Sequence, residues 1–210
     1  MIYGLRLLKN DESFSEEGLI QKTSLDKRMR KTLDAAMATV CQHLLDTNGA
    51  FEEDHETYRK TYEALLETSA NDLQSRAIRR DHDLLIEKLR YMNDYCYLSG
   101  MKDSLTGEHS SLACDIAEED FLGLDALYNT EKYKKFMDAQ ERSWARLSGC
   151  LSEPQEILCD TYKEKLTFIN YEMWVYMYIA GYEWGLSVLT EDERKNAYLR
   201  KLYKRYGINE

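Results

Sequence analysis

Apolar residues recur at helical spacing along most of the chain. In the N-terminal half this spacing predicts three helices, one from Ser24 to the "DTNGA" stop, one from the acidic run "FEEDHE", and one from Asn71 or Asp72 to about Leu105. In the first of these helices the apolar face is formed by Leu25, Met29, Leu33, Met37, Val40 and Leu44. Asn48 and Gly49 follow this face, and both tolerate the left-handed backbone that ends many helices.

The same periodicity returns in the C-terminal half. One helix is predicted from about Thr130, a second opens at Ser152 to Pro154 and reaches about Leu189, and Thr190 caps a terminal helix. A single proline and few turn clusters argue against a strand-rich fold. The sequence therefore predicts an all-α helical bundle of about six or seven helices. We expect an N-terminal helical half (1–106), a connection (107–129) and a C-terminal helical half (130–210), or one compact domain containing both halves.

Two predicted helices share a sequence motif, Tyr-x-Tyr-[Leu/Ile]-[Ser/Ala]-Gly, which ends at Gly100 and at Gly181. Aligning these glycines also aligns Tyr95 with Tyr176 and Tyr97 with Tyr178. The match indicates two repeated helical hairpins, although chance similarity between two amphipathic helices stays open.

Gly181 and Gly185 lie four residues apart, on one face of the predicted helix. A glycine inside a helix costs about 1 kcal/mol relative to alanine, so some compensating contact is expected. Close packing of a neighbouring helix is one explanation. A groove floored by the glycines and flanked by Tyr178, Tyr182 and Trp184 is the other.

The chain carries 38 acidic and 28 basic residues, for a net charge of -10. This balance does not favour direct nucleic-acid binding or attraction to anionic lipid, and it predicts a protein partner with a basic surface. Head-to-tail self-association into a homo-oligomer also stays open, because acidic and basic runs alternate along the chain. The residues predicted to bind the partner are Glu52, Glu53, Asp54, Glu56, Glu118, Glu119, Asp120, Tyr182 and Trp184.

Five cysteines without a CxxC pair are typical of reduced thiols, and no apolar stretch approaches the roughly 20 residues that a membrane helix needs. We therefore expect a cytoplasmic protein without membrane association. The chain has no phosphate-binding glycine loop and no GxSxG motif. The spacing of Glu52 and His55 fits a helix start better than a metal site, and the acids beside His82 fit a charged helix face better than a catalytic base with its orienting acid. No cofactor, metal or catalytic residue is predicted.

The segment "LSEPQEILCDTYKEKLTFINYEMWVYMYIAGYEWGLSVL" resembles the C-terminal half of small, uncharacterised helical proteins of Firmicutes and their mobile elements. The similarity covers about forty residues. Its matching positions are Ser152, Gln155, Gly181, Tyr182, Gly185 and Leu186. The resemblance carries no catalytic residue, and it implies a protein of a bacterium, a phage or another mobile element.

Acidity, absent reaction motifs and the mobile-element resemblance together predict a non-enzymatic interaction protein. One form is an inhibitor of the anti-CRISPR or DNA-mimic type, which occupies a basic surface of a nucleic-acid-handling protein. Two alternatives stay open. The first is a small-molecule binder or enzyme that uses the aromatic groove near Tyr178 and Trp184. The second is a DNA-binding regulator that uses the basic ends of the chain, around Lys27 to Lys31 and Arg194 to Arg205.

Overall fold

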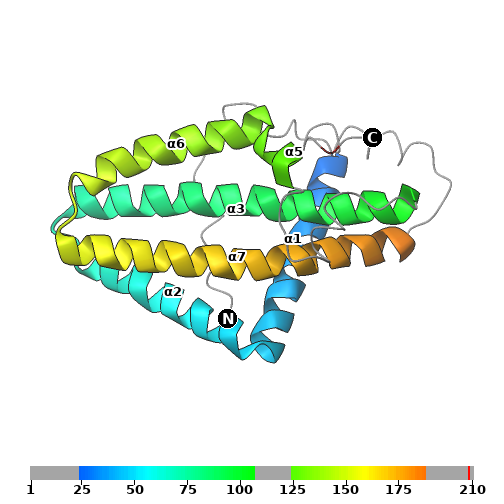
Figure 1. The fold of residues 1–210 in the computed structure, drawn as a ribbon, viewed down its shortest axis with the longest axis horizontal. Coiled ribbons are helices and arrows are strands. Elements are labelled where there is room, and N and C mark those ends of the chain that lie inside the picture. The colour runs from blue at the N-terminus through cyan, green and yellow to red at the C-terminus, as the bar shows by residue number, and fades with distance from the viewer. Residues whose placement is uncertain (1–23, 107–123, 188–207, 209–210) are drawn as a thin grey trace. The chain divides into compact units, whose positions relative to one another are not determined.

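A computed structural model of the chain describes residues 24–106, 124–187 and 208, and every regular element in these ranges is a helix (Figure 1). The helices are α1 (Ser24–Thr47), α2 (Gly49–Glu67), α3 (Asp72–Thr106), α5 (Asp125–Tyr128), α6 (Glu131–Ser148) and α7 (Glu153–Ser187). The all-α class is confirmed. The described residues form five long helices and one short helix of 4 residues, so the number of long helices is below the six or seven predicted. The helix expected after Thr190 lies outside the described residues, as does most of the predicted connection.

The chain divides into two compact units, residues 1–35 and residues 36–210. The described part of the first unit is the beginning of α1, where Arg30 and Asp34 form an ion pair one turn apart, at 3.2 Å between Nε and Oδ1. The second unit contains the remainder of α1 and all the other helices, and it carries every feature discussed below.

Local side-chain contacts set the helix boundaries. Thr130 caps α6 as predicted, since its hydroxyl accepts a hydrogen bond from the Tyr133 amide at 3.2 Å. The left-handed stop expected at Asn48 and Gly49 is wrong. Asn48 is extended, with φ at -120°, and its side chain accepts hydrogen bonds from the amides of Ala50 and Phe51. It therefore caps α2, which starts at Gly49 rather than within the acidic run, because the capped amides have no partner inside the helix.

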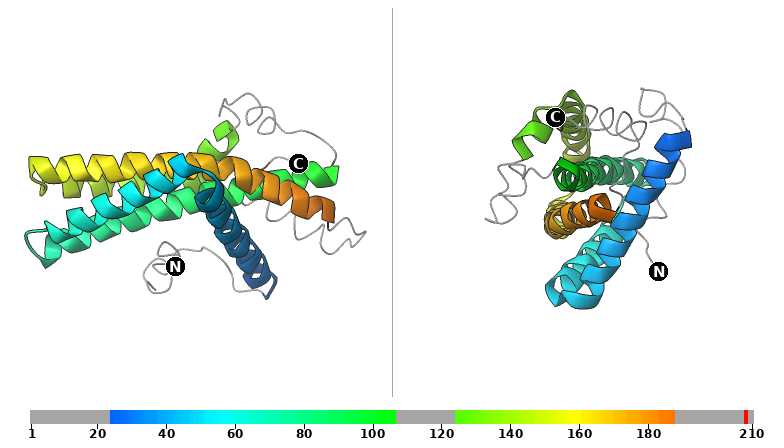
Figure 2. Two further views of the ribbon diagram at one scale, coloured as in Figure 1. Left: turned by 90° about the horizontal axis from the view of Figure 1, so that it is seen from below. Right: turned by 90° about the vertical axis from the view of Figure 1, so that its right-hand side faces the viewer.

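The long helices of the second unit lie in the spatial order α6, α3, α7, α2, and α3 and α7 run side by side in the same direction (Figures 1 and 2). The first helix of each predicted hairpin packs chiefly against the second helix of the other hairpin, α2 on α7 and α6 on α3. The contact between α3 and α7 therefore joins the two halves of the unit.

The two helices are closest where the motifs that end at Gly100 and Gly181 meet. A Cβ atom on Gly100 would overlap the carbonyl oxygen of Tyr178, and one on Gly181 would overlap the carbonyl oxygen of Tyr97. Gly185 lies in the same way against the side chain of Ser104. The glycines thus let two helix backbones touch, which is the packing role expected from their cost within a helix.

The reciprocity of these contacts bears on the predicted repeat. Each glycine faces the tyrosine carbonyl three residues before the other glycine, as two equivalent helices crossing at equivalent points would do. Gln74 and Gln155, which the same alignment pairs, hydrogen-bond each other at 3.2 and 3.4 Å. Each of them also donates to a carbonyl of the other half, Gln74 to Cys150 and Gln155 to Thr68. The repeat of two hairpins stays a prediction, which this pairing favours.

Further buried polar pairs follow the line of contact between α3 and α7. They are Asp81 with Lys163 at 2.7 Å, Asn93 with Asn170 at 2.7 Å, and Asp103 with Tyr178 at 2.6 Å. A sliding of one helix along the other would leave these groups buried and unpaired, which costs about 1–3 kcal/mol for each group. The polar pairs therefore help to fix the register of the two helices.

Replacing Gly181 with leucine should lower the free energy of unfolding by several kcal/mol, because the new side chain would have to enter the backbone contact with α3. Urea unfolding of the purified protein measures the change. Gly149→Ala is the control, since no neighbouring atom lies within 4 Å of a Cβ atom at that position and a change within about 0.5 kcal/mol is expected. A Gly181→Leu protein as stable as the wild type would show that this glycine does not serve helix packing.

Candidate interaction surface on α7 and the start of α2

A row of acidic side chains winds along the exposed surface of α7, because each step of four residues turns about 40° around the helix axis. It consists of Glu156, Asp160, Glu164 and Glu172, each exposed, and the exposed ring of Phe168 occupies the remaining place in this four-residue spacing. At 1.5 Å per residue the neighbouring positions lie about 6 Å apart, and the row extends over about 24 Å. We call these five residues the acidic row.

None of the carboxylates of the acidic row forms an ion pair with a described residue, although Glu164 is close enough to Lys165 to help raise the pKa of that lysine. The two lysines of α7 turn toward other helices. Lys163 pairs with the fully buried Asp81 and lies 3.7 Å from the centre of the Trp144 ring, and Lys165 pairs with Asp54 of α2 at 2.6 Å. Like charges four residues apart destabilise a helix by about 0.2–0.5 kcal/mol per pair. Asp160 and Glu164 carry this cost, whereas Glu156 lies in the first turn of α7, where the helix dipole favours a negative charge.

A depression of about 250 Å³ adjoins the row between the start of α2 and α7. Its lining consists of Asn48, Ala50, Phe51, Asp54, Phe168, Ile169, Tyr171 and Glu172. Phe168 and Tyr171 are 48% and 38% exposed, so two aromatic rings face solvent beside carboxylates. Exposed aromatic rings next to unpaired charges are typical of surfaces that bind other proteins.

The structure separates the acids predicted at the start of α2 into two kinds. Glu52 and Glu53 are exposed and form no ion pair among the described residues. Asp54 holds Lys165, and Glu56 pairs with Lys60 at 2.8 Å, a hydrogen bond that lowers the pKa of Glu56. Only the first two carboxylates are free for a partner.

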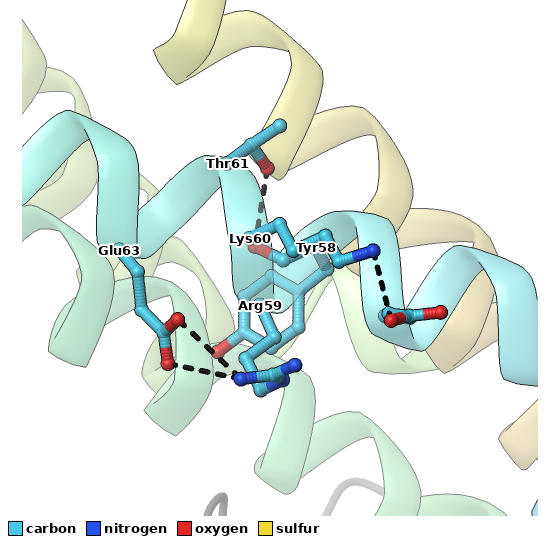
Figure 3. A network of polar contacts seen from close by, with 6 residues as sticks. Tyr58, Arg59, Lys60, Thr61 and Glu63 are labelled. Carbon is cyan, nitrogen blue, oxygen red and sulfur yellow. Dashed lines mark hydrogen bonds and ion pairs between the residues drawn. The ribbon is translucent and has the colours of Figure 1, made fainter.

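Beyond Glu56, the outer face of α2 is neutralised within the helix. Arg59 reaches Glu63 one turn later at 3.4 Å, and Lys60 reaches back to Glu56 (Figure 3). The contrast with α7 identifies the acidic row, together with Glu52 and Glu53, as the surface with excess negative charge in the described part of the second unit.

The other predicted binding residues lie elsewhere. Glu118, Glu119 and Asp120 are outside the described residues, as are the basic residues from Arg194 to Arg205. Tyr182 and Trp184 are half-buried on α7, and their role in binding stays a prediction. The alternative of a groove floored by Gly181 and Gly185 is wrong. Both glycines lie against α3, and Tyr178 is buried there, so the glycines do not form the floor of an open groove.

The two acids that flank His82 make different contacts. His82 is buried, and its Nε2 lies 2.7 Å from the hydroxyl of Tyr58 on α2. Asp81 pairs with Lys163, and Oδ1 of Asp83 lies 3.6 Å from Nδ1 of His82. The ring also stacks on Tyr62, with the ring centres 4.1 Å apart. His82 thus belongs to an aromatic contact between α2 and α3.

Two of the described cysteine thiols resemble core residues more than nucleophiles. Cys96 and Cys159 are completely buried, and burial raises the pKa of both thiols, so the reactive thiolate form is disfavoured. Over residues 24–106, 124–187 and 208, no three His, Cys, Asp or Glu side chains are grouped so that they could hold a metal ion.

Comparisons with protein-family models, curated proteins and solved structures gave no match to this chain. The similarity to helical proteins of Firmicutes and their mobile elements therefore stays a prediction from the C-terminal segment. None of the helices in the described ranges combines the length and the apolar character that crossing a membrane requires.

Sequence reasoning missed Phe168, Tyr171, Glu172 and the acidic row. The spacing of the acids at positions 156, 160 and 164 is visible in the sequence, and it could have indicated one charged helix face. The two lysines at 163 and 165 obscured this signal, because only the folded helix shows that they point toward α3 and α2.

The contribution of the ion pair between Lys163 and Asp81 to stability can be tested by substitution. Lys163→Met should lower the free energy of unfolding by about 3 kcal/mol, since it leaves the fully buried carboxylate of Asp81 without its partner. Replacing both residues, as Asp81→Leu with Lys163→Met, should recover much of this loss. The exposed pair of Lys135 and Glu131 supplies the control, and Lys135→Met should cost less than about 1 kcal/mol. Equal losses for the two single lysine variants in urea unfolding would contradict the assigned role of Lys163.

Proposed function

We propose that this protein is a non-enzymatic interaction protein, which binds a basic surface of another protein through the outward face of α7 and the start of α2. The acidic row is the observation that carries the proposal. It presents unpaired carboxylates on a rigid helix, beside two exposed aromatic rings.

The composition of this face suits protein recognition. Aromatic residues are enriched among the side chains that contribute most to binding energy, whereas charges at the rim accelerate association and select the partner. Here Phe168 and Tyr171 lie next to the carboxylates of Glu164 and Glu172, so the apolar and the charged contributions would act in one place. A long helix also pays little conformational entropy when it binds, because its backbone is already ordered.

The finer form of the proposal is an inhibitor that occupies the nucleic-acid site of its partner, in the manner of anti-CRISPR or DNA-mimic proteins. The support for it is the regular spacing of about 6 Å along the acidic row. The phosphates of a DNA strand also follow one another at regular intervals, so a basic groove that contacts successive phosphates is the kind of site the row would occupy.

Two rival roles gain less from the geometry. Two-fold self-association through the acidic row would bring identical carboxylates together, which is repulsive, whereas the predicted head-to-tail form would set the row against a basic surface of a second copy and stays an alternative. A small-molecule site near Tyr178 and Trp184 would require an open groove, whereas Tyr178 is buried and bonded to Asp103. We place the protein in the cytoplasm, for which the free buried thiols of Cys96 and Cys159 give support.

Reversing the charge of the row should weaken partner binding while leaving the fold intact. We expect the combined change Glu156→Lys, Asp160→Lys and Glu164→Lys to weaken the affinity at least tenfold, mainly through slower association. The partner is captured from extract of the native host with the wild-type protein, identified by mass spectrometry, purified, and titrated against each variant. The melting temperature should stay nearly unchanged, because exposed charges contribute little to stability.

The matched control reverses three exposed carboxylates elsewhere, Glu67, Asp138 and Glu141, and so changes the net charge by the same amount. It should bind within about twofold of the wild type. Binding of the wild type should also weaken as the Debye length falls from ~10 Å at 0.1 M salt to ~3 Å at 1 M. A partner that binds the row variant and the control equally well, at low and at high salt, would overturn the proposal.

A further inference from the structure

We infer that the C-terminal part of α7 binds an amphipathic helix of the partner, one whose apolar side is bordered by lysine or arginine. This inference rests on the proposed function, because it names the element through which the basic partner is recognised. Its basis is a line of apolar side chains on α7 that the fold leaves partly open. The line consists of Val175, Ile179, Tyr182 and Leu186, and we call it the apolar stripe.

The apolar stripe has the spacing of a helix-packing seam. Its members follow one another after four, three and four residues, which keeps them on one side of the helix, as in a coiled coil. Ile179 and Leu186 are 42% and 50% exposed. Val175 and Tyr182 are half-buried, and the Tyr182 ring also stacks on buried Tyr178, at 6.5 Å between ring centres. Single exposed apolar residues are ordinary, whereas a connected line of them is typical of a surface that another protein covers.

The corresponding face of α3 lies against a helix. The alignment that pairs the two glycine-ended motifs also places Leu98 on Ile179 and Tyr91 on Glu172. Leu98 is completely buried, and Tyr91 packs on Phe136 of α6, with 5.8 Å between the ring centres. The equivalent face of α7 is open at Ile179 and Glu172. A helix is therefore the element whose shape fits the apolar stripe.

The charge beside the apolar stripe favours a basic helix. Over residues 166–187, α7 carries two carboxylates, Glu172 and Glu183, and no lysine or arginine. Both carboxylates are exposed, and neither forms an ion pair with a described residue. Lysine or arginine next to the apolar side of an incoming helix would pair with them, as charges at the flanks of a coiled coil do. Two copies joined stripe to stripe would instead bring like charges together.

The test uses three labelled peptides of about 18 residues, each titrated into the full chain and followed by fluorescence anisotropy. The first has leucine at the spacing of the apolar stripe, lysine beside the leucines, and alanine elsewhere. The second is a scrambled sequence of the same composition, and the third has glutamate in place of lysine. We expect the first peptide to bind with a dissociation constant at least about tenfold lower than either of the others. It should shift NMR amide signals of residues 172–187 in the isotope-labelled chain.

Substitutions in the apolar stripe assign the apolar contact. Ile179→Ser and Leu186→Ser should each weaken binding of the first peptide at least about fivefold. The matched controls are Leu73→Ser and Ile157→Ser, because these side chains are 76% and 62% exposed and lie outside the stripe. Both controls should bind within about twofold of the wild type, and all four variants should unfold at nearly the urea concentration of the wild type.

A second set of variants assigns the charge contact. Glu172→Gln combined with Glu183→Gln should weaken the first peptide several-fold and reduce the dependence of its binding on salt. The control combines Glu67→Gln with Glu141→Gln, which removes two exposed carboxylates from other helices. It should leave the affinity within about twofold of the wild type.

Absence of binding, equal affinity for the first peptide and either of the others, or shifts confined to residues 156–164 would overturn the inference. A wild-type dimer that Ile179→Ser dissociates in sedimentation would also overturn it, since a second copy would then occupy the stripe. A large loss of stability in both serine variants would do the same, because the chain itself would then cover the stripe.

Each of these results would leave the proposed function in place, since that function depends on the response of the native partner to reversal of Glu156, Asp160 and Glu164. Conversely, selective binding of the first peptide together with a native partner that ignores this reversal would retain the helix site and remove the proposed function.

Discussion

The structure of the second unit depends on one close contact between two helix backbones. Gly100 of α3 lies against the carbonyl of Tyr178, and Gly181 of α7 lies against the carbonyl of Tyr97. Any larger residue at either glycine would force the helices apart. Each glycine costs about 1 kcal/mol within its helix, and the packing gained along two helices of 35 residues each offsets that cost.

The orientation of α7 follows from this contact. With Gly181 and Gly185 facing α3, the buried polar pairs align in register, and Lys163 and Lys165 are turned toward Asp81 and Asp54. The acidic side chains of α7 are then left on the outside. One packing constraint thus pairs both lysines within the fold and leaves the carboxylates of the acidic row exposed and without ion pairs among the described residues, which is the premise of the proposed function.

Helix positions were predictable because their signals are local. A cap such as Thr130 lies next to the helix boundary that it sets, and apolar periodicity is visible within a short stretch of sequence. The motifs that end at Gly100 and Gly181 indicated a close helix contact. Asn48 was misassigned because an asparagine fits either end of a helix, and only the fold shows that its side chain binds the amides of Ala50 and Phe51. Which acids are free was not predictable, since Asp54 and Lys165 lie 111 positions apart in the chain.

A double-mutant cycle on the two glycines tests the central contact most directly. Gly100→Ala and Gly181→Ala are measured singly and together by urea unfolding. If both glycines serve one crossing of α3 and α7, the first substitution separates the helices and makes room for the second. The double variant should then lose less stability than the sum of the single variants, with a coupling on the order of 0.5–3 kcal/mol. Additive losses would show that the two glycines act independently and would contradict the account.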